Sequence, residues 1–138
     1  MRLVRASRLT READLEAVRV QGKRIRTAQV EVRYLASPLR RPRVGVIVPR
    51  FSHSAVERNL VKRRLRELIR MELLPALAAR DDTAPATGTH TATEGSLDVV
   101  IRAAPSAYQA DYDTLRAAVR RAIDRIRQST AGEGRERQ

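Results

Sequence analysis

Three segments of the chain have the hydrophobic pattern of β-strands. Residues 29–35 alternate between apolar and polar positions, which is the period of a half-buried strand. The apolar side of this segment consists of Val30, Val32 and Tyr34. Residues 43–48 (RVGVIV) and residues 97–103 (LDVVIRA) are rich in β-branched residues, and a proline follows each of them closely. Both segments therefore predict buried strands that end before the proline.

Helical periodicity occupies three other segments. Residues 10–21 predict a short helix, with Thr10 placed to cap it and Gly22 placed to end it. Residues 55–74 predict a long helix in front of a proline, and residues 110–128 predict a final amphipathic helix.

Two segments have no apolar period. Residues 80–96 are rich in Thr, Ala, Asp and Gly and predict a flexible loop. Residues 129–138 are polar and predict a disordered tail. The remaining helices and strands alternate unevenly, which favours the α+β class, with a single mixed β-sheet packed with helices. We therefore expect one domain over residues 1–128.

The charge of the chain points to a polyanionic partner. Lys and Arg number 28 against 16 Asp and Glu, a formal net charge of +12. Self-repulsion from such an excess opposes compaction, so a nucleic acid explains it better than the fold does. A general compositional bias towards Arg is the alternative. The absence of cysteine excludes disulfides and thiolate sites, and no apolar stretch predicts a membrane span or a signal peptide. We expect a cytoplasmic protein without membrane contacts.

The predicted helix 55–74 concentrates positive charge beside its apolar stripe. At about 100° per residue, one arc is apolar and the adjacent arc is polar and basic. The apolar arc holds Val61, Leu65, Leu68 and Ile69. The basic arc holds Asn59, Lys62, Arg63, Arg66 and Arg70. Like charges one turn apart repel, so a phosphate-binding ridge accounts for this arc, and an ordinary solvated face is the alternative.

The sequence does not predict a catalytic centre on the protein. A metal-dependent nuclease needs clustered carboxylates to hold its ions. The adjacent acidic pair Asp81 and Asp82 falls in the predicted loop, and His53 and His90 are far apart in sequence.

The basic helix carries a recognisable motif. Arg58-Asn59-x-x-Lys62-Arg63-x-x-Arg66 resembles the R-N-x-x-K-R-x-x-R signature of the bacterial ribonuclease P protein component. The strand 43–48, the residues Ala55-Val56 and the strand 97–103 are similar to the family in order and spacing. The opening Arg8-Leu9-x-Arg11-x-x-Asp14-Leu15 is similar to that of the family as well. The resemblance covers roughly residues 8–128.

The resemblance implies a ribonucleoprotein endoribonuclease that matures the 5′ end of tRNA. In this family the RNA subunit holds most of the Mg²⁺ and cleaves, and the protein alone is not expected to cleave. The implied partners are ribonuclease P RNA and precursor tRNA, without protein oligomerisation or an organic cofactor. The implied fold is ribosomal protein S5 domain 2-like, with a left-handed βαβ crossover. The implied RNA-binding residues are Arg8, Arg11, Arg50, Arg58, Asn59, Lys62, Arg63, Arg66 and Arg70.

The resemblance also implies a groove for the single-stranded 5′ leader of precursor tRNA. We expect it to be lined by Leu15, Val18, Val32, Tyr34 and Phe51. Leu15 stands where the family usually has a stacking Phe, and His53 stands where it usually has Gly. Phe51 is a candidate for a stacking surface at a shifted position. For Leu15 and Val18, ordinary core packing is the alternative.

Three other functions are compatible with a basic helix. One is a structured-RNA-binding protein of ribosomal type without an associated nuclease. Another is a DNA-binding regulator, although the chain has no helix-turn-helix pattern and no dimerising heptads. The third is a basic scaffold for acidic proteins.

Overall fold

The computed structural model describes residues 8–37, 42–77 and 97–136, with side chains up to residue 129. The predicted loop 80–96, with Asp81, Asp82 and His90, lies outside the described residues. In chain order the elements are α1 (Glu12–Gln21), β1 (Lys23–Arg26), β2 (Val30–Ala36), β3 (Arg43–Ile47), α2 (Ala55–Leu68), a π-helical turn (Ile69–Leu73), β4 (Leu97–Ala103), a 3-10 turn (Pro105–Tyr108) and α4 (Tyr112–Glu136).

The four strands form one mixed sheet in the order β1-β2-β4-β3. The pairs β1–β2 and β2–β4 are antiparallel, and β3–β4 is parallel. In front of α1, the chain runs beside the outer edge of β3, where the Leu9 amide donates to the Val44 carbonyl at 3.0 Å. This arrangement confirms the predicted α+β class.

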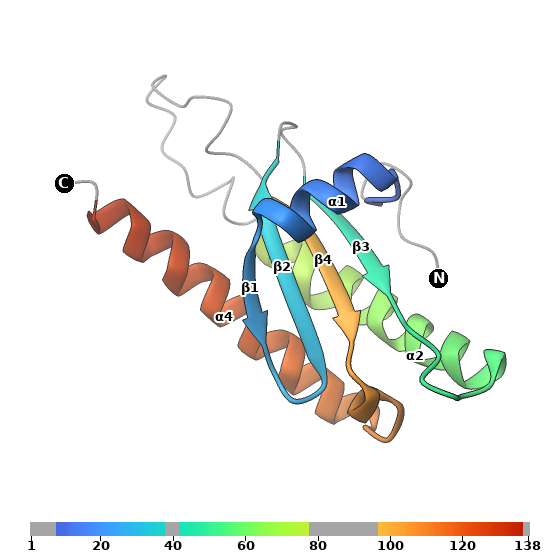
Figure 1. The fold of residues 1–138 in the computed structure, drawn as a ribbon. Helices are drawn as coiled ribbons and strands as arrows, with labels where there is room; N and C mark the ends of the chain where they lie inside the picture. Colours follow the sequence, from blue (N-terminus) through green and yellow to red (C-terminus); the bar gives the residue numbers. More distant parts are fainter. Residues whose placement is uncertain (1–7, 38–41, 78–96, 137–138) are drawn as a thin grey trace.

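The connection from β3 through α2 to β4 is left-handed. In Figure 1 both strands run downward, α2 lies behind the sheet, and the chain moves from β3 on the right to β4 on its left. General experience with parallel strands favours the opposite hand. The crossover implied by the resemblance is therefore confirmed.

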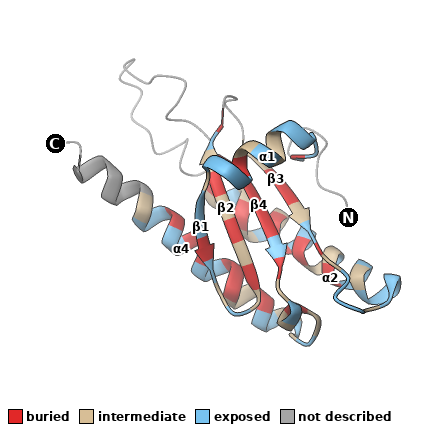
Figure 2. Cartoon of the chain, viewed as in Figure 1, coloured by how far each residue is buried: buried red, intermediate tan, exposed pale blue. Residues whose placement is uncertain are grey.

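The main core lies between the sheet and the helices α2 and α4. Alternate residues of β2, among them Val30 and Val32, point to this face and are almost fully buried. They pack against the apolar stripes of the helices, including Leu65 of α2 and Leu115 of α4. Figure 2 shows the buried positions concentrated along the strands and the inner sides of these helices.

Among the described residues, α1 covers the opposite face of the sheet, and it does so at one end (Figure 1). A small second core lies there, formed by Leu9, Val18 and Val100 with Leu15 and Leu35 against it. A Cβ atom at Gly45 would lie 2.8 Å from the Leu9 carbonyl oxygen and 2.9 Å from Leu15 Cδ2. Gly45 is therefore needed for close approach.

An ion-pair network fixes α1 to this face. The Arg43 guanidinium donates to both carboxylate oxygens of Asp98, at 3.0 and 2.8 Å, and to Asp14 of α1 at 3.2 Å. The side chains of Arg43 and Asp98 are only 14% and 5% exposed. The hydrogen bond to Asp98 raises the pKa of the Arg43 guanidinium, and the negative charges of Asp98 and Asp14 raise it further.

The structure differs from the sequence predictions at two helix ends and in one additional strand. Arg11, and not Thr10, occupies the N-cap of α1, without a side-chain capping bond. The strand β1 was not predicted, because its four residues include one apolar position, Ile25. The helix α4 continues to Glu136, past the predicted end at residue 128, because extending a formed helix costs little per residue. The disordered tail predicted from residue 129 is therefore wrong as far as Glu136.

Candidate nucleic-acid interface

The helix α2 begins at a capping box. The Glu57 amide donates to the Ser54 hydroxyl, and the Ser54 amide donates to the Glu57 carboxylate, each at 3.2 Å. These bonds satisfy amides that otherwise lack partners at a helix start. The bond to His53, followed by the bonds from the Ser54 amide and hydroxyl, lowers the pKa of the Glu57 carboxyl. The helix therefore starts at a fixed residue, which sets the direction of its basic side chains.

Burial of one stripe orients the rest of α2. Val61, Leu65 and Leu68 are at most 2% exposed, and the π-helical turn continues the stripe with Ile69. The sequence prediction of this stripe is confirmed. On the adjacent side lies what we call the basic ridge, which consists of Arg58, Asn59, Lys62, Arg63, Arg66 and Arg70.

The ridge is exposed at its outer side and anchored at its inner side. Asn59, Arg63 and Arg66 are exposed, and in the described part of the chain neither arginine has an acidic partner. Arg58 is half-buried, and its Nε donates to the Val48 carbonyl at 2.7 Å, which ties α2 to the end of β3. Arg70 is half-buried too, and its Nε is buried without a hydrogen-bond partner.

Positive charge is crowded on the ridge. Burial lowers the pKa of the Lys62 ammonium, and the charges of Arg58 and Arg66, one turn away on either side, lower it further. The helix therefore holds cations closer together than their mutual repulsion favours. An anion bound along the ridge relieves this repulsion.

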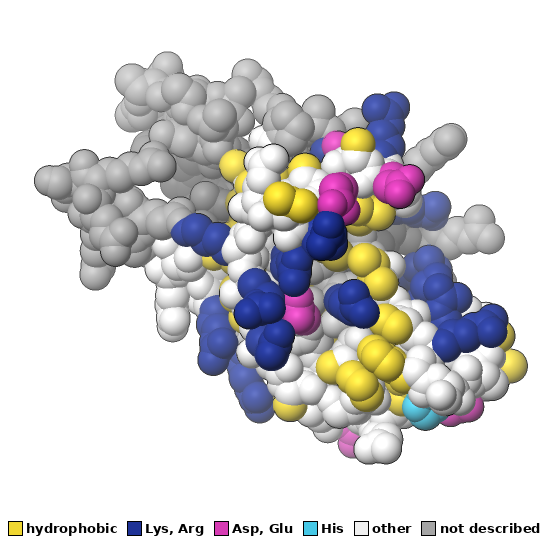
Figure 3. Space-filling model, in the orientation of Figure 1, with side chains coloured by type: hydrophobic (Ala, Val, Ile, Leu, Met, Phe, Trp, Pro, Cys, Tyr) yellow, Lys and Arg dark blue, Asp and Glu magenta, His cyan; other side chains and the backbone are white. Residues whose placement is uncertain are grey.

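A first hollow lies on the open face of the sheet beside α1. It has a volume of about 290 Å³. Its apolar lining comes from Leu15, Ile47 and Val100. Its charged lining comes from Glu12, Glu16, Arg19, Glu31, Arg33 and Arg102. Ile47 is an exposed apolar side chain, 39% accessible, on a face that Figure 3 shows to carry many basic side chains.

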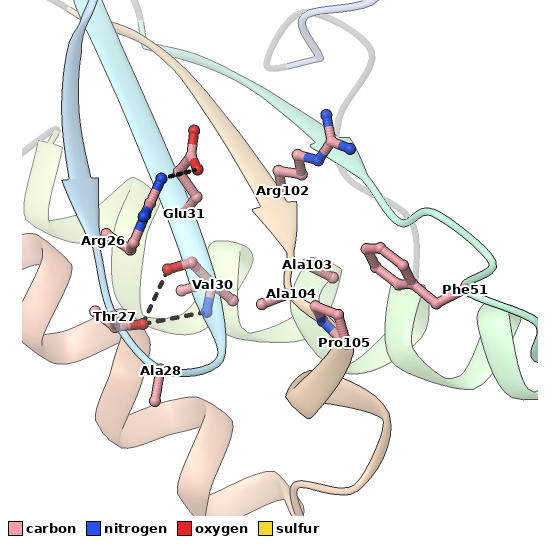
Figure 4. Close-up of a pocket in the computed structure, with 10 residues that line it drawn as sticks. All are labelled: Arg26, Thr27, Ala28, Val30, Glu31, Phe51, Arg102, Ala103, Ala104 and Pro105. Atoms are coloured by element: carbon pink, nitrogen blue, oxygen red, sulfur yellow. Dashed lines mark hydrogen bonds and ion pairs between the residues drawn. The ribbon is translucent and has the colours of Figure 1, made fainter.

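A second hollow of about 430 Å³ lies further along the same face, at the end of β4. Its lining includes Arg26, Phe51 and Pro105, as Figure 4 shows. Glu31 and Arg102 line both hollows, so the two adjoin on the open face. We refer to the two adjoining hollows together as the open-face groove.

Carboxylates hold the arginines of the open-face groove in position. Glu31 accepts a hydrogen bond from Arg33 Nε at 2.9 Å and lies 3.6 Å from Arg26. Arg33 also donates to the Arg19 carbonyl of α1 at 2.7 Å. Glu16 pairs with Arg19, and the bond to Arg19 lowers the pKa of Glu16. In the described residues Arg102 has no ion pair, and its side chain is exposed.

The predicted groove residues divide between the two faces of the sheet. Leu15 lines the first hollow and Phe51 lines the second. Val32 and Tyr34 are 1% and 5% exposed within the main core, so their assignment to the groove is wrong. Val18 is fully buried in the small core under α1, where it supports the groove without lining it.

The residues that line the groove on β2 are the neighbours of those predicted. Alternation places Glu31 and Arg33 on the face opposite to Val32, and the register pairs Arg33 with Val100 and Glu31 with Arg102. The sequence contains this signal as the polar half of the strand. It does not say which face the helices cover.

The other predicted cations lie near the two sites. Arg50 is exposed in the turn between β3 and α2, next to Phe51. Arg8 and Arg11 are exposed in front of α1, where Arg8 bridges to Val44 at the edge of β3.

No described residues form a group of three or more His, Asp or Glu able to hold a metal ion. Among the described helices, none has the length and apolar character needed to cross a membrane.

Comparison with known proteins gives a consistent result. A family model described as Ribonuclease P matches residues 3–127 of the chain. The Ribonuclease P protein component of Mycolicibacterium vanbaalenii is 36% identical over 126 residues, covering 89% of this chain and 92% of that relative. The Ribonuclease P protein component of Syntrophobacter fumaroxidans is 40% identical over 58 residues, which are 42% of this chain and 49% of that relative.

A solved structure has the same fold. The Staphylococcus aureus RNase P protein superposes with a TM-score of 0.67 and 18% sequence identity. The superposition covers 88% of this chain and 96% of that protein.

Proposed function

Because the chain belongs to the ribonuclease P protein family and has a subunit role in processing the 5′ end of tRNA, we propose how it performs that role. The basic ridge binds the ribonuclease P RNA, and the open-face groove binds the 5′ leader of precursor tRNA. The observation that carries this proposal is the presence of two distinct cationic surfaces, joined by the turn between β3 and α2.

The ridge suits the phosphate backbone of a folded RNA. Arg63 and Arg66 are exposed and free of acidic partners within the described structure, so binding does not require breaking an existing ion pair. Arginine presents a planar fork that matches phosphate oxygens. The amide of Asn59, exposed one turn before Arg63, offers both a donor and an acceptor to sugars or base edges.

The open-face groove suits a single strand. A single-stranded nucleic acid presents unpaired bases as well as phosphates, and proteins bind it with apolar surfaces inside a cationic channel. The groove has this composition, with Leu15, Ile47 and Phe51 beside Arg33 and Arg102.

We assign the chemical step to the RNA subunit with Mg²⁺ bound mainly by that RNA. The carboxylates of the groove support this assignment, because Glu16 and Glu31 are engaged by arginines. Cations dominate the basic ridge, and Arg26 and Arg102 outnumber Glu31 in the second hollow, so both places attract phosphate and repel a divalent metal ion. The role of the protein is then to raise the affinity of the complex for substrate.

Reconstitution tests the proposal. The purified chain and its cognate ribonuclease P RNA are combined at low Mg²⁺ concentration, and 5′ cleavage of a precursor tRNA is measured for each component and for both. We expect cleavage only when both are present. Tight RNA binding without any cleavage would instead support a structured-RNA-binding protein without an associated nuclease.

A further inference from the structure

The turn between β3 and α2 holds a phenylalanine in a backbone conformation that phenylalanine rarely adopts. Phe51 and Ser52 have φ angles of 46° and 71°. The His53 amide closes the turn by donating to the Arg50 carbonyl at 2.8 Å. Positive φ at both central positions defines a turn that normally contains Gly or Asn. Backbone strain of this kind concentrates at functional sites, and here it fixes the direction in which the Phe51 side chain leaves the turn.

A stack of rings supports the Phe51 side chain. Tyr108, from the 3-10 turn after β4, lies parallel to the His53 ring with centroids 3.9 Å apart. Phe51 meets the same Tyr108 ring edge to face, at 6.4 Å and 89°. The Tyr108 hydroxyl donates to the Pro49 carbonyl at 2.6 Å, and His53 Nδ1 lies 2.8 Å from the Glu57 carboxylate. Tyr108, which is itself fixed by His53 and the Pro49 carbonyl, therefore supports the Phe51 ring from the side of the 3-10 turn.

The Phe51 ring is nevertheless open to solvent. Phe51 is 40% exposed and lines the second hollow of the open-face groove. In Figure 4 its ring points from the turn towards the end of β4, on the side where Arg102 stands. The strained turn thus presents an aromatic ring to a cationic hollow.

From this geometry we infer that Phe51 is a stacking platform for one unpaired base of the precursor tRNA leader. Arg102 binds a phosphate next to that base. A planar apolar group and an anion in close succession are what a nucleotide provides. Arg102 also lines the first hollow, so a strand that stacks on Phe51 continues along the groove towards Leu15. The inference rests on the proposed function, because it places the leader in this groove.

The Phe51 ring in the second hollow provides an aromatic contact that the first hollow lacks. Leu15 contributes apolar surface there but cannot stack on a base. The stacking contact is therefore made at the opposite end of the groove, next to the start of the basic ridge. We expect one leader nucleotide to be recognised there by its ring and not by its sequence, because every base has an aromatic face.

Fluorescence of a base analogue locates the platform. The holoenzyme, formed from the full chain and its ribonuclease P RNA, is bound to precursor tRNAs that carry 2-aminopurine at successive leader positions. We expect quenching that depends on Phe51 at one leader position, lost in Phe51→Ala and retained in Phe51→Tyr. Identical quenching profiles for the wild type and Phe51→Ala would overturn the inference.

Leader length separates the platform from a structural effect. Phe51→Ala should weaken binding of a long-leader precursor by about 5- to 100-fold and leave a precursor with a one-nucleotide leader unchanged. Met71→Ala, which removes an exposed apolar side chain outside the groove, is the matched control and should change neither. Equal weakening for both precursors would mean that Phe51 acts through the turn and α2, against the inference.

A glycine variant separates the ring from the turn. Phe51→Gly suits the positive φ angle and removes the ring, so it should fold well and lose as much long-leader affinity as Phe51→Ala. Recovery of affinity in Phe51→Gly would assign the effect to backbone geometry and overturn the platform. If wild-type protein does not distinguish long from short leaders, the failure lies with the proposed leader groove itself.

Discussion

Two arginine-rich helices, α2 and α4, pack on the same face of the sheet but use their arginines differently. On α4, Arg116 and Arg120 converge on Glu72 of the π-helical turn, at 2.9 and 3.3 Å. On α2, Arg63 and Arg66 have no acidic partner among the described residues, and Lys62 lies between Arg58 and Arg66. Arginine therefore stabilises the fold through Arg116 and Arg120 on α4, and it remains available to a ligand through Arg63 and Arg66 on α2.

The difference shows why charge composition alone is a poor guide to a binding surface. Arg64 lies on α2 too, yet it donates to the Ala110 carbonyl at 3.1 Å and joins α2 to the start of α4. What distinguishes the basic ridge is the concentration of cations at successive turns on one side of α2, where Lys62 lies between Arg58 and Arg66. Repulsion retained in the free protein is favourable only when a polyanion removes it.

Charge reversal on the two helices gives the largest expected contrast. Arg63→Glu with Arg66→Glu should weaken binding of ribonuclease P RNA by about 100-fold and reduce the log-log salt slope by about two. The matched control is Arg121→Glu with Arg125→Glu on α4, where both side chains are exposed and unpaired in the described structure. We expect at most a few-fold loss for the control, measured by filter binding across a salt series. Equal losses for the two pairs would show that only net charge matters.

Removal of the helix caps comes next in size. Ser54→Ala opens the capping box of α2, and Asp111→Ala removes the carboxylate that accepts from the Thr114 amide of α4 at 2.8 Å. Each should lower the free energy of unfolding by about 1 kcal/mol, measured by urea denaturation. Only Ser54→Ala should also weaken RNA binding, because it frays the start of the basic ridge. A similar loss of RNA affinity in Asp111→Ala would contradict the distinction between the helices.

Glu72 should influence stability but not RNA binding. Hydrogen bonds from Arg116 and then Arg120 lower the pKa of Glu72, so the folded state binds its proton more weakly than the unfolded chain. This contribution to stability is present above the unfolded pKa and is lost as pH falls through the folded pKa. Glu72→Gln should cost less than about 1 kcal/mol at neutral pH and make acid unfolding less steep. An unchanged acid transition would show that the pair contributes nothing.

Removal of the Lys62 charge has the smallest expected effect. Unlike the preceding variants, it should raise the free energy of unfolding. Lys62→Met keeps the aliphatic packing and removes a cation whose pKa is lowered by burial, Arg58 and Arg66. The free energy of unfolding at pH 7 should rise by a few tenths of a kcal/mol, while RNA affinity falls. Thermal denaturation and RNA binding on the same sample test both signs. A decrease in stability would mean that the lysine is not under repulsion.

The signature helix could be predicted closely from the sequence, and the groove could not. Val61, Leu65 and Leu68 repeat with the period of a helix, so their burial and the exposure of Arg63 follow from geometry. The alternation of β2 separated Val32 from Arg33 correctly, but it does not reveal which side the helices cover. That choice depends on how α1, α2 and α4 pack, which is a property of the whole chain.

Two further features depend on distant parts of the chain. The edge strand β1 is stabilised by pairing with β2 and by burial of Ile25, neither of which a four-residue segment reveals. The support of Phe51 by Tyr108 joins residues 57 positions apart in sequence. The contact between Phe51 and Tyr108 arises because β3 and β4 are parallel neighbours, so the segments that follow them start at the same end of the sheet.

The position of β4 in the sheet has a consequence for synthesis of the protein on the ribosome. β4 is the last strand to be made, yet it lies between β2 and β3 and joins them. Until residues 97–103 emerge, the hairpin of β1 and β2 and the strand β3 have no common partner, and α2 has no completed sheet to pack on. A nascent chain therefore acquires its cationic surfaces in their final arrangement only after β4 has emerged, which delays RNA assembly until that strand has been made.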